Sequence, residues 1–79
     1  MVSDLEKRVR EVFLKSRDML EVMEGLRHNK VALKVRLMRW REELENVLDD
    51  ISELRKKVSS DESRLLRFES RLIRNALRN

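Results

Sequence analysis

The sequence contains no cysteine and no proline, one glycine and only three aromatic residues. Without cysteine, neither a disulfide framework nor a thiolate metal site can support a small core. Without proline, and with Gly25 as the only glycine, the chain has few residues suited to the turns of a β-sheet protein. These absences favour an all-α fold.

Long hydrophobic runs are also missing, since uninterrupted apolar stretches such as residues 31–33 are only a few residues long. A helix needs about 20 apolar residues to span a bilayer. The first residues show neither the pattern of a secretory signal nor the glycine required for myristoylation. We therefore expect a soluble, intracellular protein without a membrane span, in either the cytoplasm or the nucleus.

The familiar catalytic and ligand-binding motifs, including Gly-rich phosphate loops, HExxH and EF-hands, are absent from the sequence. The acid pairs Glu42-Glu43 and Asp49-Asp50 are adjacent in sequence, so their side chains point about 100° apart on a helix. His28 has no second histidine or acidic cluster at ligand spacing. We expect no catalytic residue, no metal and no cofactor, and hence no enzyme.

The chain has 79 residues, of which 43% are charged and 41% hydrophobic. This composition is typical of long helices and coiled coils. A chain of this length forms one domain and buries only about 60–65% of its unfolded surface when it folds alone. We therefore predict a single helical oligomerisation or interaction domain over residues 1–79.

Apolar residues between positions 33 and 58 recur at alternating spacings of four and three. The mean spacing of 3.5 places them along one seam of a helix, about 39 Å long, that must face another helix. We call this set the seam and predict it as the core or oligomer interface: Leu33, Leu37, Trp40, Leu44, Val47, Ile51, Leu54 and Val58.

Residues that favour helix ends divide the chain into three parts. Ser3 with Glu6, and Ser59 with Glu62, have the spacing of capping boxes. Gly25 can adopt the left-handed conformation that ends a helix. With Asn29 as the next cap, the sequence predicts helices over about 3–24, 29–58 and 60–78, assembled as a homo-oligomeric bundle.

An alternative keeps the chain as one long parallel two-stranded coiled coil. The register of the seam continues in both directions with few polar interruptions, and it places Val9 and Ile51 at a and Leu5 and Leu54 at d. β-Branched residues at a and leucine at d favour parallel dimers. A rod of this kind would be about 118 Å long.

Charge is distributed in blocks. Residues 25–41 contain six cations and no acid, whereas residues 42–62 contain eight acids and three cations. A helix with oppositely charged halves pairs favourably with an antiparallel copy of itself.

The last block, residues 63–79, contains five arginines spaced three and four apart, and one acid, Glu69. Arginine forms bidentate contacts with phosphate, but the same row can instead pair with acids of an adjacent helix. The possible phosphate-binding residues of both basic blocks are Arg27, Lys30, Lys34, Arg36, Arg39, Arg41, Arg64, Arg67, Arg71, Arg74 and Arg78.

The sequence thus favours a non-catalytic structural or protein–protein interaction module that self-associates through the seam, most simply as a homodimer. Another helical protein is the alternative partner. A second function class is a dimeric helical protein that binds the phosphate backbone of double-stranded RNA or DNA through its arginine-rich faces. The cationic block 27–41 is also compatible with an anionic membrane surface.

Overall fold

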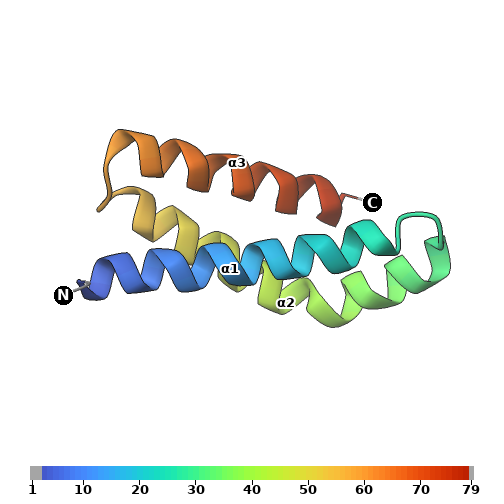
Figure 1. Cartoon of the computed structure of the whole chain (residues 1–79). Helices are drawn as coiled ribbons and strands as arrows, with labels where there is room; N and C mark the ends of the chain where they lie inside the picture. The colour runs from blue at the N-terminus through green and yellow to red at the C-terminus, as the bar shows by residue number, and fades with distance from the viewer. Residues whose placement is uncertain (1–2, 79) are drawn as a thin grey trace.

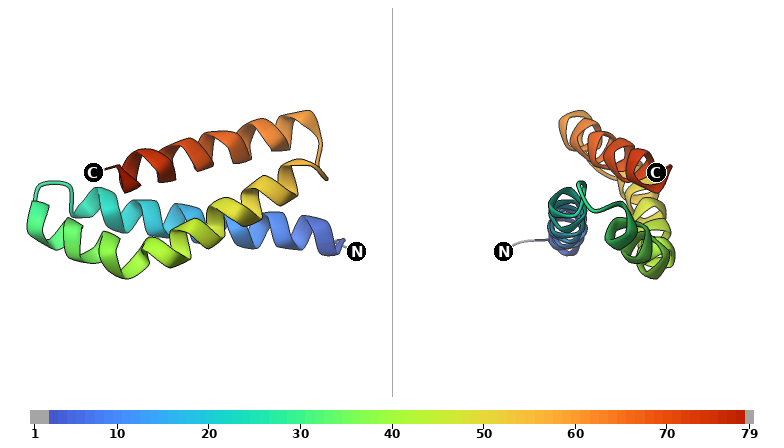
Figure 2. Two further views of the ribbon diagram at one scale, coloured as in Figure 1. Left: turned by 180° about the vertical axis from the view of Figure 1, so that it is seen from behind. Right: turned by 90° about the vertical axis from the view of Figure 1, so that its right-hand side faces the viewer.

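Three helices form an up-down-up bundle in the computed structural model, which describes residues 3–78 (Figure 1). They are α1 (Asp4–Gly25), α2 (Lys30–Arg55) and α3 (Ser60–Leu77). Each helix packs against both others, and the end-on view of Figure 2 shows them at the corners of a triangle. The prediction of an all-α fold is confirmed. Residues 1, 2 and 79 of the predicted domain lie outside the described residues.

The alternative of a single rod is wrong for this chain. The described residues extend 43 × 21 × 18 Å, far less than the ~118 Å of a continuous helix. The chain reverses at residues 26–29 and again at 56–59. The heptad register of the sequence therefore continues across two turns of the chain, and the capping residues Asn29 and Ser59 start a new helix after each turn.

The predicted caps are present at the start of all three helices. Ser3 Oγ accepts a hydrogen bond from the Glu6 amide at 3.2 Å, and Ser59 Oγ accepts one from the Glu62 amide at 3.3 Å. Asn29 Oδ1 accepts from the Ala32 amide at 3.1 Å. Each cap satisfies one of the four amides that a helix start leaves unpaired and stabilises its helix by about 1 kcal/mol.

Two details of the helix ends differ from the prediction. Gly25 does not adopt a left-handed conformation; it is the last residue of α1, and α1 ends with Leu26 at φ −98°, whose amide bonds to Met23 O at 3.1 Å. The turn is thus made by tightened backbone hydrogen bonds. α2 ends at Arg55 instead of residue 58, because the amide of Lys57 already bonds to Leu54 O, only three residues back.

The seam of α2 faces the two other helices of the same chain. Leu44, Val47, Ile51 and Leu54 are at most 2% exposed, Leu37 is also buried, and the three remaining members are half-buried. Burial of each such side chain contributes about 1.5–3 kcal/mol. The core that they form is completed from α1 and α3 by Met19, Met23, Leu66 and Ile73.

Candidate functional site

The most distinctive surface of the molecule is the outward side of α3. At 100° per residue, its five arginines fall within an arc of about 80° on the side of the helix away from Leu66 and Ile73, and all five are exposed. We call this set the arginine row: Arg64, Arg67, Arg71, Arg74 and Arg78. The row spans about 21 Å along the helix.

No member of the arginine row forms an ion pair within residues 3–78. The two ion pairs of the described residues join Arg17 to Glu69 and Arg27 to Glu24. Pairing of the row with acids of an adjacent helix, one of the two expectations from sequence, is therefore not found among the described residues. Five guanidinium groups remain available to an external anion.

Glu69, the one acid within the span of the row, is turned into the bundle and is 1% exposed. The Ser16 hydroxyl donates a hydrogen bond to its Oε2 at 2.9 Å, and Arg17 Nε lies 2.8 Å from its Oε1. The Arg17 contact is a close ion pair that is not aligned as a hydrogen bond. Because the carboxylate of Glu69 contacts Ser16 and Arg17 of α1, it does not neutralise the outward face of α3.

Sequence reasoning missed the buried role of Glu69, although its position carried a signal. Glu69 follows Leu66 by three residues and precedes Ile73 by four, which places it on the buried side of α3. Ser16 interrupts the apolar line of α1 in the same way and is completely buried. The two polar exceptions meet each other in the core.

Two shallow hollows lie along the arginine row. One, of about 350 Å³, is lined by Arg64, Arg67, Arg71 and the ring of Phe68. The other, of about 360 Å³, continues toward the C-terminal end of α3 and is lined by four arginines and an asparagine: Arg67, Arg71, Arg74, Asn75 and Arg78. Such concave, cation-lined surfaces suit the oxygens of phosphate groups.

The cations of residues 27–41 fall into two groups, one of Arg27, Lys30, Lys34 and Arg41 and one of Arg36 and Arg39. Lys34 and Arg41 line a hollow of about 140 Å³ together with Leu77, near the C-terminal end of α3. Lys34 also lines a hollow of about 400 Å³ together with Arg27, Lys30 and Leu33. Arg36 is stacked over Trp40, with its guanidinium carbon 4.9 Å from the ring centroid, and Arg39 is exposed on the Arg36 side of the helix.

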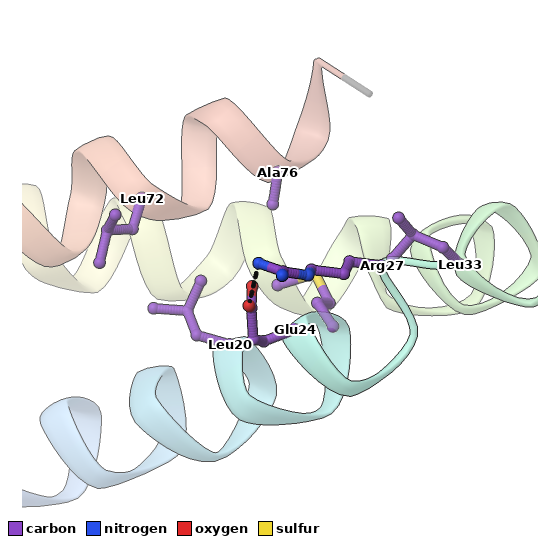
Figure 3. Close-up of a pocket in the computed structure, with 7 residues that line it drawn as sticks. Leu20, Glu24, Arg27, Leu33, Leu72 and Ala76 are labelled. Atoms are coloured by element: carbon purple, nitrogen blue, oxygen red, sulfur yellow. Dashed lines mark hydrogen bonds and ion pairs between the residues drawn. The ribbon is translucent and has the colours of Figure 1, made fainter. Parts of the chain in front are cut away.

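Arg27 makes a local contact with the end of α1. Its Nη1 forms an ion pair with Glu24 Oε1 at 2.8 Å at the rim of a hollow of about 200 Å³, where the end of α1, the start of α2 and the end of α3 meet (Figure 3). Leu20, Leu33, Leu72 and Ala76 make the rest of this hollow mainly apolar (Figure 3). His28 is exposed and accepts a hydrogen bond from Arg27 Nε.

Alternation of the helices segregates charge along the long axis. The end of α1, the start of α2 and the end of α3 share one end of the bundle (Figures 1 and 2). Residues 15–41 and 70–78, which build this end, contain eleven cations and three acids; the remaining residues contain eight cations and twelve acids. One end of the molecule therefore has a net charge of +8 and the other −4.

Within residues 3–78, no three His, Asp or Glu side chains converge as metal ligands, and no helix has the length and apolar character to cross a membrane. Trp40 packs against the core as expected of a seam member. Comparisons with protein-family models, curated proteins and solved structures found no match to this chain.

Proposed function

We propose that this protein binds the phosphate backbone of a nucleic acid through the arginine row of α3. The observation that carries the proposal is that all five arginines are exposed and none is engaged by an acid within residues 3–78. Lys34 and Arg41 lie beside Leu77 near the C-terminal end of α3 and add positive charge there. Contacts of this type position a protein on the backbone without reading sequence.

The test is a fluorescence-anisotropy titration of the full chain against labelled oligonucleotides at several salt concentrations. Each phosphate that a cation neutralises contributes about 0.7–0.9 to the slope of log affinity against log salt. Replacing two members of the row with R67E/R74E removes two such contacts. We expect at least about a ten-fold loss of affinity at low salt and a slope smaller by about 1.5.

The matched control is R8E/R10E, which changes the net charge by the same amount on exposed residues of α1, a different helix from the one that carries the arginine row. We expect this variant to retain most of the affinity and the full salt slope. Absence of binding by the unaltered chain at low salt, or equal losses in the two double variants, would refute the proposal.

Self-association is the second candidate function. The seam is occupied by the chain's own helices, so its use between copies requires an exchange of helices. A different surface is open on the outward side of α2, where Val31, Val35 and Met38 are 75%, 54% and 72% exposed. The same side of α2 continues into the acids Glu42 and Asp49.

An antiparallel copy would bring the cationic half of each α2 beside the acidic half of the other. Sedimentation velocity at 10–100 μM distinguishes the states. A dimer that becomes monomeric in V35S/M38S supports association through this surface. A monomer of about 9.6 kDa throughout the range contradicts it.

A further inference from the structure

Phe68 is the aromatic side chain that does not pack against the core. Its ring is 51% exposed, whereas Phe13 and Trp40 pack against the buried cluster. Phe13 and Trp40 each also have an arginine over the ring, Arg17 at 5.7 Å and Arg36 at 4.9 Å. Within residues 3–78, no cation covers Phe68, so one apolar ring remains open on a strongly cationic helix face.

The surroundings of Phe68 indicate what covers it. Arg64 is four residues before it and Arg71 three residues after it, so both are its neighbours on the helix surface. With Arg67, they line the hollow of about 350 Å³ into which the ring opens. A ligand that fits here combines a flat apolar group with negative charge on either side. A nucleobase in a phosphodiester chain has this combination.

We infer that α3 binds single-stranded nucleic acid, with an unpaired base stacked on Phe68 and the flanking phosphates held by Arg64 and Arg71. This inference deepens the proposed function and rests on it. Bases inside a duplex are stacked on one another and cannot lie on a protein ring, whereas every unpaired base offers its face. The structure therefore predicts a preference for single strands over duplexes of the same length.

The experiment compares three labelled 16-nucleotide probes: a thymine-only single strand, an abasic single strand of the same length, and a duplex. The variants of the full chain are F68A, F68W and the control L65A. Leu65 is 56% exposed on the same helix, so L65A removes a comparable apolar surface away from the hollow. Circular dichroism verifies that each variant is folded.

Stacking on one aromatic side chain contributes about five- to hundred-fold in affinity. We expect F68A to lose at least about five-fold for the thymine strand, while its affinity for the abasic strand and the duplex changes less than about two-fold. F68W and L65A should bind the thymine strand like the unaltered chain.

Equal losses for all three probes, an unchanged affinity of F68A for the thymine strand, or equal binding of single strand and duplex by the unaltered chain would overturn the inference. In these cases the proposed phosphate binding survives if R67E/R74E still weakens binding. Absence of binding to every probe overturns both.

Discussion

On its inner side α3 presents the carboxylate of Glu69 to a serine and an arginine of α1; on its outer side it presents five arginines to solvent. Both sides carry formal charge within the same five helical turns. The inner charge is desolvated and must be paired to be tolerated, whereas the outer charges are hydrated and need no partner. The inner side therefore supports the fold, and the outer side is the surface that we propose for recognition.

The largest contrast between the sides should appear in apolar truncations. Ile73 is completely buried, so I73A should lower the free energy of unfolding by about 2–5 kcal/mol. L65A, on an exposed position of the same helix, should change it by no more than about 0.5 kcal/mol. Urea denaturation followed by circular dichroism measures both. If I73A fails to fold, I73V should still show a loss of about 0.5–1.5 kcal/mol; equal effects of I73V and L65A would contradict the assignment of the inner side.

The ion pair to Glu69 should give the next largest effect. R17A leaves a buried carboxylate without its counter-charge, so we expect a loss of about 1–3 kcal/mol. R10A removes an exposed arginine of the same helix and should change stability by less than about 0.5 kcal/mol.

A double-mutant cycle separates the contribution of the Arg17–Glu69 ion pair to stability from that of the stacking of Arg17 on Phe13. In an E69Q background the carboxylate charge is gone, and R17A should then cost clearly less than in the unaltered chain. The same loss of stability in both backgrounds would show that Arg17 does not stabilise the buried charge of Glu69.

The smallest effect on stability should come from a substitution in the arginine row, and it should be a gain instead of a loss. Arg71 lies three or four residues from Arg67 and Arg74, and like charges at these spacings destabilise a helix by about 0.2–0.5 kcal/mol per pair. R71Q should therefore raise stability by a few tenths of a kcal/mol at low salt and lose that gain at about 1 M salt, where the Debye length is about 3 Å.

The comparison for R71Q is R10Q, which lies four residues after Glu6 and should show no gain. A gain from R71Q that persists at high salt would mean that the arginines do not repel one another.

Much of the architecture follows from the sequence. The spacing of the seam from Leu33 to Val58 placed the core, and Ser3, Asn29 and Ser59 placed the helix starts, because capping side chains act on amides two or three residues away. Such local interactions can be recognised from the sequence alone. The end of α2 and the conformation of Gly25 were predicted less well, since a helix can stop through tightened backbone hydrogen bonds without a special residue.

Prediction from sequence also failed where two distant positions decide the outcome together. Whether the seam faces α1 and α3 or another copy depends on how the turns fold the chain back, and residue spacing is the same in both cases. Glu69 and Ser16 are 53 residues apart, so neither position alone reveals the buried contact. The arginine row was identified from its spacing, but only the structure shows that Glu69, the one acid within its span, is turned inward and does not offset it.

Because the two ends of the bundle differ in net charge, the molecule has an electric dipole moment. Its positive pole lies where α3 ends and α2 begins. In the field of a polyanion such a body turns as it diffuses, so that productive encounters outnumber those of random tumbling. Capture of a charged polymer would then be quickest in dilute electrolyte and slow markedly as ions are added, through the rate of arrival as well as the strength of the final complex.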